Sequence, residues 1–220
     1  MSLPPKLPSV AVFCPQSKAP GTKYLESLQS YITGNDHLEP LVRAIRDIAD
    51  TWDIFAKHRE DIAALDQGPR YMKSFSNWIT TGESTALANA MSGIISLPLL
   101  TIIQTCQYFQ YLETQQIPHR DLAQYLRKSG GIQGYCGGLL PAMAIACSKD
   151  EAEVVENVAK AMRLAVGIGA FGELGDDENI PGPTTIVVRL KYVGQGDEIV
   201  KKFPGVSYLL TFDPTILIKA

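Results

Sequence analysis

Residues 131–140, which read Gly-Ile-Gln-Gly-Tyr-Cys-Gly-Gly-Leu-Leu, decide how the rest of the chain is interpreted. They contain the pattern G-x-C-x-G, in which Cys136 lies between Gly134 and Gly138. A short strand-like run precedes this pattern and the apolar residues 139–146 follow it, so the predicted order is strand, tight turn and helix. This is the order of a nucleophile elbow, with a thiol in place of the usual hydroxyl.

The physical demands of a nucleophile elbow fit these residue types. The turn holds its central residue in strained backbone torsions, and small flanking residues allow neighbouring elements to approach closely. The central side chain is then exposed at a helix N-terminus, where the helix dipole and unpaired N–H groups favour a thiolate. The alternative is a glycine-rich connection between strand and helix that carries a buried, structural cysteine. The pentapeptide alone leaves both interpretations open.

Length, charge and composition bound the class of protein. With 220 residues, of which 45% are hydrophobic, the chain can bury one substantial core with room for a small second lobe. The formal net charge is −3 and there is no basic stripe or arm, so neither nucleic acid nor a membrane surface is an expected partner. Residues 1–8 are broken by prolines and lack the apolar run of a signal peptide. We expect a cytoplasmic location.

The four cysteines do not follow a metal-binding or disulfide pattern. There is no C-x-x-C pair, so we expect free thiols in a reducing compartment and no bound metal. Cys106 and Cys147 lie in apolar stretches of helical period, where a cysteine is expected to fill the core. Cys14 follows a strand-like run and is the main competitor of Cys136. Because Pro15 follows Cys14, we expect no helix N-terminus there to stabilise a thiolate.

Apolar periodicity predicts that the first part of the chain is mostly helical. We expect a strand over 9–13, a helix capped by Asp150, and further helices over 24–32, 38–52, 70–79, 94–115, 121–126 and 139–146. Residues 80–89 are rich in glycine, serine and threonine and are expected to form a loop. Pro98 and several glutamines interrupt the very apolar stretch 94–115, which indicates a helix in a globular core and not a membrane span.

The acidic residues 173–183, which include glycines and prolines, are typical of a linker. After them, residues 184–218 predict the order strand, helix, strand, strand. That order is two elements short of a ferredoxin-like β-α-β-β-α-β unit. We therefore expect a first domain over 1–182, the start of a small subdomain over 183–220, and further sequence after Ala220.

Taken together, these residues resemble the starter-unit acyl-carrier-protein transacylase domain at the N-terminus of fungal non-reducing polyketide synthases. The resemblance is carried by GGIQGYCGGLLPAMAIA, by the preceding LTIIQTCQYFQYLE and by the following AMRLAVGIG. The early VFCPQS and the late FPGVSYLLTFDP extend it over most of the chain from Ser9. It implies an α/β acyltransferase fold, with an α/β-hydrolase-like large subdomain over 1–182 and a ferredoxin-like small subdomain, incomplete here, over 183–220.

The resemblance also implies the activity, which is transfer of an acyl starter unit to an acyl carrier protein without a bound cofactor. The donor would be a phosphopantetheine thioester, either acyl-coenzyme A or the carrier protein of an upstream reducing synthase. Cys136 would hold the acyl group as a thioester, which suits reversible transfer. The tetrahedral oxyanion needs two N–H donors. The resemblance assigns these to Gly137 and to Gln16, in the loop after the first strand, and it places Tyr135 in the substrate pocket.

The histidines depart from the family pattern. Family members place a general-base histidine after the small subdomain, whereas His37, His58 and His119 all precede Cys136. We expect His37 and His58 to be solvated and His119 to begin a helix. The base is therefore expected beyond Ala220.

The substrate-binding helix is the second departure. Malonyl-specific acyltransferases bind the substrate carboxylate with an arginine on the helix after the elbow, and AMRLAVGIG places Ile168 at that position, with Arg163 five residues earlier. An apolar residue there favours a neutral acyl group, because a buried carboxylate without a cation is costly. Two other functions stay open. One is a cysteine thioesterase or hydrolase of the α/β-hydrolase class, and the other is a non-catalytic module that docks a carrier protein.

Overall fold

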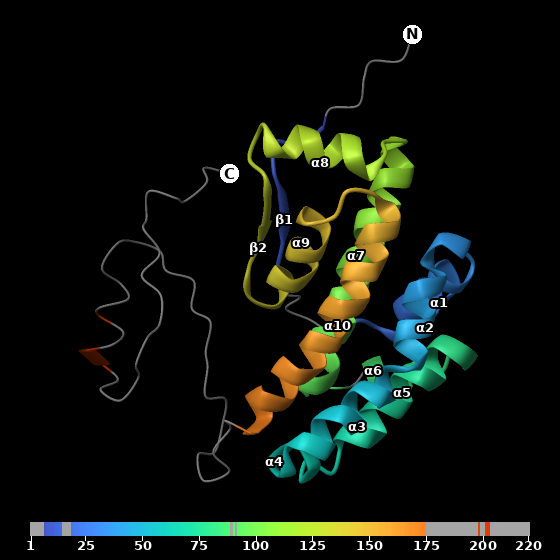
Figure 1. Cartoon of the computed structure of the whole chain (residues 1–220), viewed down its shortest axis with the longest axis vertical. Helices are drawn as coiled ribbons and strands as arrows, with labels where there is room; N and C mark the ends of the chain where they lie inside the picture. The colour runs from blue at the N-terminus through green and yellow to red at the C-terminus, as the bar shows by residue number, and fades with distance from the viewer. Residues whose placement is uncertain are drawn as a thin grey trace. The chain divides into compact units, whose positions relative to one another are not determined.

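The computed structural model describes residues 7–14, 19–88, 90, 92–174, 198 and 201–202 (Figure 1). The chain divides into two compact units, Met1–Asp177 and Glu178–Ala220, and nearly all described residues belong to the first. Of the elements predicted over 184–218, only residues 198 and 201–202 are described, and these are helical; the remainder lies outside the described residues, and so do Gln16 and most of the predicted linker. The domain boundary after residue 182 therefore stays a prediction.

Two short parallel strands form the sheet of the described part of the chain. β1 (Ala11–Phe13) pairs with β2 (Ile132–Gly134), and the register places Phe13 opposite Gly134. The strands predicted after residue 9 and before the elbow are therefore confirmed. Because parallel strands end at the same edge of a sheet, Cys14 and Tyr135 leave β1 and β2 side by side.

The other described elements are helices, so the architecture is a mainly helical α/β arrangement. In chain order they are α1 (Thr22–Thr33), the 3-10 helix η1 (Asp36–Leu38), α2 (Glu39–Arg46), α3 (Ile48–His58), α4 (Glu60–Ala63), α5 (Gly68–Thr81), α6 (Thr85–Ala88), α7 (Gly93–Gln115), α8 (His119–Arg127), the 3-10 helix η2 (Cys136–Gly138), α9 (Leu139–Ala146) and α10 (Glu151–Leu174). Among the described residues, none of these helices combines the length and apolarity needed to cross a membrane.

In two stretches the observed helices differ from the predicted secondary structure. The single helix expected over 38–52 is divided at Asp47, whose φ of −94° and ψ of 15° leave the α-helical region, so α2 and α3 are separate helices. The loop expected over 80–89 is shorter, because α5 continues to Thr81 and α6 follows the left-handed Gly82. Leu87 of α6 is buried, and tertiary burial of this kind overrides the turn-forming composition.

The core of the described unit is built around α7 and α10. These helices pack along one another, and α10 also contacts α9, α2 and α3 (Figure 1). A pair of glycines permits the close approach of the two helices, since a Cβ on Gly169 would lie 2.4 Å from the carbonyl oxygen of Gly93. Buried residues occur on all sides of α7, which explains why its sequence is apolar throughout. Cys106 lies within α7 and is buried, as predicted.

Candidate functional site

Cys136 lies at the turn between β2 and the helices that follow it. Its φ of 52° is in the left-handed region, which non-glycine residues rarely adopt. η2 begins at Cys136 and α9 continues from Leu139, so the predicted order of strand, turn and helix is confirmed. The Cys136 side chain is exposed, and the alternative of a buried structural cysteine therefore does not describe it.

The two glycines of the G-x-C-x-G pattern occupy positions where a side chain does not fit. A Cβ on Gly134 would lie 2.5 Å from the Cα of Leu139, and a Cβ on Gly138 would lie 2.2 Å from the carbonyl oxygen of Phe13. Both distances are far below van der Waals contact. The backbone of the turn therefore packs directly against α9 on one side and against the end of β1 on the other.

Gly137, which the family resemblance assigned as an oxyanion donor, is the second residue of η2. The N–H of Gly138 donates to the carbonyl oxygen of Tyr135 at 3.0 Å, and the N–H of Leu139 donates to that of Cys136. Gly137 comes one residue before Gly138, the first of these donors. The first N–H groups of a helix lack intrahelical acceptors. Such N–H groups bind anions. The backbone of Gly137 is buried at the base of the turn.

The end of β1 is bonded both to the elbow and to α7. The N–H of Tyr135 donates to the carbonyl oxygen of Phe13 at 2.8 Å. The Nε2 amide group of Gln104 on α7 donates to the carbonyl oxygen of Cys14. In the sequence Gln104 is only a polar interruption of an apolar helix, and no local signal points to its partner. Cys14 is exposed, as Cys136 is, so two thiols lie at the ends of adjacent strands.

The prediction for Cys147 is wrong. It was expected to fill the core, but it is exposed, because α9 ends at Ala146 and Cys147 is the residue that caps the helix. Cys106 is buried, and this burial raises its pKa well above that of an ordinary thiol. Since a buried neutral thiol is a poor nucleophile, Cys106 is not a candidate for covalent chemistry.

His119 is buried and has partners for both ring nitrogens. Its Nε2 lies 3.0 Å from the carbonyl oxygen of Ser148, and its Nδ1 lies 2.7 Å from the hydroxyl oxygen of Tyr108. Because a carbonyl only accepts, Nε2–H donates to Ser148 and Nδ1 accepts from the Tyr108 hydroxyl. The backbone N–H of His119 donates to Oε1 of Glu151 at 2.6 Å. These bonds join α8 to α7, to the start of α10 and to the residue Ser148 that follows α9, whereas Cys136 precedes the N-terminal end of α9.

The other two histidines are exposed, as predicted. The ring of His37 lies edge-on to that of Phe109, with 5.4 Å between centroids, and His58 is the last residue of α3. Within the part of the chain that the structure describes, no histidine is hydrogen-bonded to Cys136, and no group of three or more metal-ligating side chains occurs.

The remaining predicted site residues lie at the turn and on the neighbouring helix. Tyr135 is 40% exposed and adjoins Cys136. Ile168 is 45% exposed and lies on α10, which packs against α9, and Arg163 of the same helix is also exposed. The structure therefore brings Tyr135, Cys136 and Gly137 together in one turn, and places Ile168 on an adjacent element. Gln16 lies outside the described residues.

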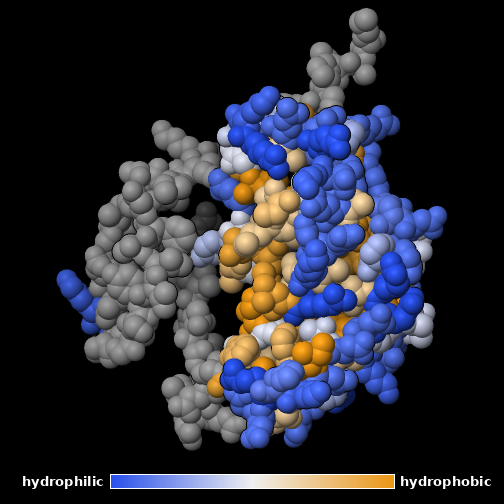
Figure 2. All heavy atoms as spheres, viewed as in Figure 1, coloured by the Kyte–Doolittle hydropathy of each residue, from blue (hydrophilic) through white to orange (hydrophobic). Residues whose placement is uncertain are grey.

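Ile168 belongs to an exposed hydrophobic surface, here called the α9–α10 apolar surface. Figure 2 shows hydrophobic residues gathered over these helices. The large exposed hydrophobic side chains of these two helices are Leu139 and Met143 of α9 and Leu164, Ile168 and Phe171 of α10. At one end of it the guanidinium carbon of Arg59 lies 4.7 Å from the centre of the Phe171 ring. The apolar surface begins at Leu139, three residues after Cys136.

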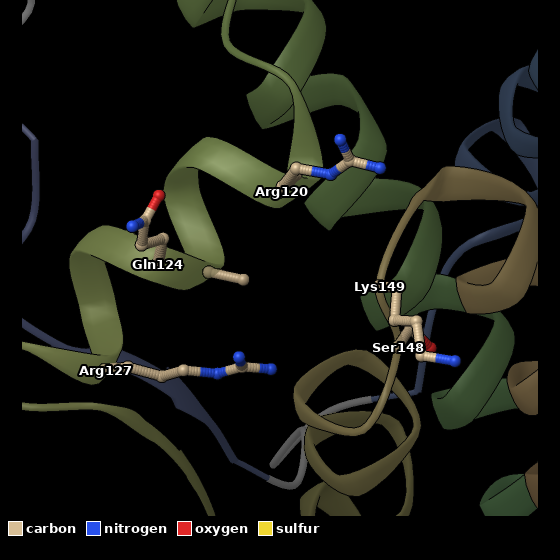
Figure 3. A pocket seen from close by; sticks show the side chains of 6 residues that line it. Arg120, Gln124, Arg127, Ser148 and Lys149 are labelled. Atoms are coloured by element: carbon tan, nitrogen blue, oxygen red, sulfur yellow. The ribbon is translucent and has the colours of Figure 1, made fainter.

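A separate hollow of about 370 Å³ lies between α8 and the connection from α9 to α10 (Figure 3). Three cationic side chains line it, namely Arg120, Arg127 and Lys149, and Arg127 donates to the carbonyl oxygen of Ala146 at 3.4 Å. None of the predicted site residues lines this hollow. It adjoins the C-terminal end of α9, whereas Cys136 precedes the N-terminal end.

Comparison with known proteins places the chain in a family. A sequence model described as "Starter unit:ACP transacylase in aflatoxin biosynthesis" matches residues 53–177. The non-reducing polyketide synthase atr1 of Stereocaulon alpinum is 57% identical over 209 residues, which are 95% of this chain and 8% of that protein. The non-reducing polyketide synthase Preu6 of Preussia isomera is 41% identical over 196 residues, which are 89% of this chain and 9% of that protein.

A more distant relative is the methylphloroacetophenone synthase of Cladonia uncialis, which is 29% identical over 189 residues, or 84% of this chain and 7% of that protein. The chain thus spans less than a tenth of the length of these relatives. The family match includes α7, β2, the Cys136 turn, α9 and the whole of α10, but not β1. On this basis, the chain belongs to the starter-unit acyl-carrier-protein transacylase family of fungal non-reducing polyketide synthases.

Proposed function

We propose that this chain forms part of an acyltransferase that loads a neutral starter unit onto the acyl carrier protein of an iterative polyketide synthase. One observation carries the proposal. The exposed thiol of Cys136 follows a parallel strand at a left-handed backbone position, immediately before α9. Membership of the transacylase family supports the same activity. The acyl donor is a thioester of coenzyme A or of the carrier protein of an upstream reducing synthase, and the enzyme is cytoplasmic.

The reaction consists of two thioester exchanges. First, the Cys136 thiolate attacks the carbonyl carbon of the donor thioester, and the tetrahedral intermediate expels the donor thiolate, which takes up a proton. Second, the phosphopantetheine thiolate of the carrier protein attacks acyl-Cys136, and Cys136 leaves as a thiolate. Each exchange breaks one C–S bond and forms another. The two directions are therefore close in free energy, and the transfer needs no bound cofactor.

Two backbone N–H groups stabilise the oxyanion in this proposal. The N–H of Gly137 comes from the base of the turn, and that of Gln16 comes from the loop after β1. Support for this pair comes from β1 itself, because its end at Phe13 is bonded to Tyr135 of the elbow. A loop that follows β1 therefore begins beside Cys136. Loss of one such donor typically lowers kcat by about 10²–10³-fold.

The general base in this proposal is a histidine outside the described residues. His119 is unsuited to the task because both of its ring nitrogens take part in buried hydrogen bonds. His37 and His58 belong to η1 and α3, and neither is hydrogen-bonded to Cys136 among the described residues. The proposed architecture is a large α/β-hydrolase-like subdomain over 1–182, followed by a ferredoxin-like small subdomain that begins over 183–220.

The acyl pocket is proposed to include Ile168 and Tyr135. Both side chains are substantially exposed within the described unit, as a substrate-contacting residue must be before substrate binds. The apolar side chains of Leu139 and Met143 adjoin the Cys136 turn on α9 and favour an uncharged acyl group. A carboxylate buried against such a surface without a cation is strongly disfavoured.

The two rival functions share the exposed thiol but differ in the fate of the acyl group. A hydrolase forms acyl-Cys136 and releases the acyl group to water. A docking module forms no acyl-enzyme. The test is intact-mass spectrometry of the protein at its full natural length, first with acetyl- or butyryl-coenzyme A alone and then with added phosphopantetheinylated carrier protein.

A transferase is expected to show one acyl adduct that persists in buffer and disappears when the carrier protein becomes acylated. Rapid loss of the adduct in buffer, with no dependence on the carrier protein, would identify a hydrolase. Absence of any adduct with neutral acyl donors would support the docking module and overturn the proposal.

A further inference from the structure

Two exposed thiols lie at the ends of the two paired strands. Cys14 directly follows β1, Cys136 comes two residues after β2, and both are exposed and free of disulfide bonds. The proposed function uses only Cys136. Cys14 is therefore a second nucleophilic group close to the reacting thiol, and acyl transfer gives it no task.

The alternation of side chains along the strands directs Cys14 to the open face of the sheet. Phe13 is buried and Val12 is 52% exposed, so successive residues of β1 face the core and the outside in turn. Cys14 continues this alternation on the outer side, where it is exposed. Tyr135, which follows β2, is 40% exposed. Cys14 and Tyr135 thus leave the sheet on the same open face, and Cys136 comes next.

The register brings the two cysteines within the range that a disulfide spans. Phe13 pairs with Gly134, and the N–H of Tyr135 donates to the carbonyl oxygen of Phe13 at 2.8 Å, which continues the pairing. Cys14 therefore lies beside Tyr135 and one diagonal step from Cys136. With strands about 4.8 Å apart and a rise of about 3.3 Å per residue, such a step corresponds to about 6 Å between Cα atoms. Disulfides most often join Cα atoms that are about 5.5–6 Å apart.

The backbone on either side of this pair is held in place by tertiary contacts. Gly138, two residues after Cys136, packs on the end of β1 so closely that an added Cβ would lie 2.9 Å from the backbone nitrogen of Cys14. The turn therefore brings the chain back towards Cys14. The Nε2 amide group of Gln104 on α7 donates to the carbonyl oxygen of Cys14. Two thiols that extend from fixed, neighbouring backbone segments react with each other far more readily than separate thiols do.

No other cysteine of the chain is placed to pair with Cys136. The chain has four cysteines, and all of them are described. Cys106 is buried in α7. Cys147 is exposed, but α9 separates it from Cys136, and the eight residues of this helix span about 12 Å. Cysteines with Cα atoms more than about 7 Å apart do not form a disulfide without movement of the backbone. Cys14 is therefore the partner within reach.

We propose that Cys14 and Cys136 form a reversible disulfide, which makes the nucleophile turn a redox-sensitive site. Hydrogen peroxide is the oxidant in this proposal. The thiolate of one cysteine attacks a peroxide oxygen, the O–O bond breaks, and a sulfenic acid and hydroxide form. The other thiolate then attacks the sulfenic sulfur, the S–S bond forms, and the S–O bond breaks to release a second hydroxide. The hydroxides take up the two thiol protons, so two thiols and one peroxide give one disulfide and two waters.

The disulfide has two consequences for Cys136. It occupies the sulfur that receives the acyl group, so acyl transfer stops until a thiol reductant restores the two thiols. It also protects that sulfur, because a sulfenic acid that finds no thiol is oxidised further to a sulfinic acid, which thiols do not reduce. The effect on acyl transfer rests on the proposed function, whereas the formation of the bond does not.

Peptide mapping of the protein at its full natural length tests the pairing. The protein is treated with hydrogen peroxide, free thiols are blocked with N-ethylmaleimide, and the sample is digested with trypsin without reduction. Trypsin releases Cys14 in peptide 7–18 and Cys136 in peptide 129–149, which also contains Cys147. The Cys147→Val variant therefore assigns the bond to one thiol. We expect the two peptides to be disulfide-bonded in the wild type and in Cys147→Val, and not in Cys14→Ala.

A second measurement follows acylation of Cys136 by acetyl-coenzyme A before peroxide, after peroxide and after reduction with dithiothreitol. The wild type should lose acylation with peroxide and regain its starting rate on reduction, and Cys147→Val should do the same. Untreated Cys14→Ala should be acylated as fast as the wild type. After peroxide its acylation should not return, because Cys136 is then a sulfinic acid.

Two results would overturn the inference. One is the absence of the Cys14–Cys136 bond at peroxide concentrations that convert Cys136 to its sulfinic acid. The other is equal recovery of acylation in the wild type and in Cys14→Ala. If Cys14→Ala does not fold, Cys14→Ser takes its place. A protein that forms the bond, but that no thioester acylates in its reduced form, contradicts the proposed function and confirms the pairing.

Discussion

The Cα atom of Gly138 packs directly on the peptide that ends β1, and a Cβ added to it would lie 2.2 Å from the carbonyl oxygen of Phe13. This contact joins the second glycine of the elbow to a strand more than a hundred residues earlier in the chain. It explains why the turn at Cys136 and the end of β1 are one structural unit. Any side chain at position 138 must separate them.

The first prediction concerns this contact. Gly138→Ala should lower the free energy of unfolding by at least about 2 kcal/mol, because backbone atoms on both sides cannot move aside cheaply. Gly172→Ala is the control, since a Cβ there meets nothing within 4 Å and alanine is the better helix former in α10. Urea unfolding of the two variants measures the difference. Equal stabilities would show that the close contact with β1 is absent.

The second prediction separates structure from catalysis at His119. His119→Ala removes a buried ring with two hydrogen-bonding partners and should lower stability by about 2–4 kcal/mol. The folded fraction should still acylate Cys136 at the rate of the wild type. His58→Ala, at an exposed position, should change neither quantity. A stable His119→Ala protein that has lost acylation would instead make His119 the general base.

The third prediction follows from the buried thiol of Cys106. Burial raises its pKa in the folded state, so the folded chain keeps this proton at pH values where the unfolded chain releases it. The stability that depends on this proton is complete below about pH 8.5 and declines as the pH rises, by up to about 1.4 kcal/mol per pH unit. Unfolding free energies at successive pH values above that point should therefore fall.

A pair of cysteine variants identifies the source of this decline. Cys106→Val should make the alkaline decline shallower, whereas Cys147→Val, at an exposed thiol, should leave the slope as it is. An unchanged slope in Cys106→Val would show that the Cys106 thiol ionises equally readily in both states.

The fourth prediction concerns the choice of acyl group. Transfer of malonyl should be at least tenfold slower than that of acetyl or butyryl, which corresponds to about 1.4 kcal/mol, because Ile168 offers no cation to the carboxylate. The transfer rates of neutral starters should differ in a graded manner, by about 10- to 200-fold for each methylene added or removed. Ile168→Arg should raise malonyl transfer relative to acetyl, and Arg163→Ala should not. Malonyl transfer as fast as acetyl in the wild type would contradict the apolar pocket and implicate Arg163.

Features with local physical causes could be predicted from the sequence. The elbow is one. The glycines around Cys136 favour a tight turn between a strand and a helix, and Cys136 occupies that turn at a left-handed φ. The cap of α10 is another: the N–H of Glu153 donates to Oδ1 of Asp150 at 2.9 Å, within one turn of chain. The long apolar helix α7 was also evident from composition alone.

Features that depend on distant contacts could not be predicted. The partner of Gln104 lies 90 residues away, and no local pattern relates it to Cys14. The burial of His119 depends on Tyr108 and Ser148, which belong to two other segments of the chain. Cys147 was misassigned because periodicity does not fix the last residue of a helix. The assignments of Gln16 and Ile168 came from family resemblance and stay predictions.

The central claim is that Cys136 receives the acyl group, although Cys14 and Cys147 are exposed too. The most direct measurement is peptide mapping of the protein at its full natural length after reaction with acetyl-coenzyme A. The account predicts acetyl label on the peptide that contains Cys136, loss of all label in Cys136→Ala, and undiminished label in Cys14→Ala. Label on Cys14 or Cys147 with Cys136 unmodified would contradict it.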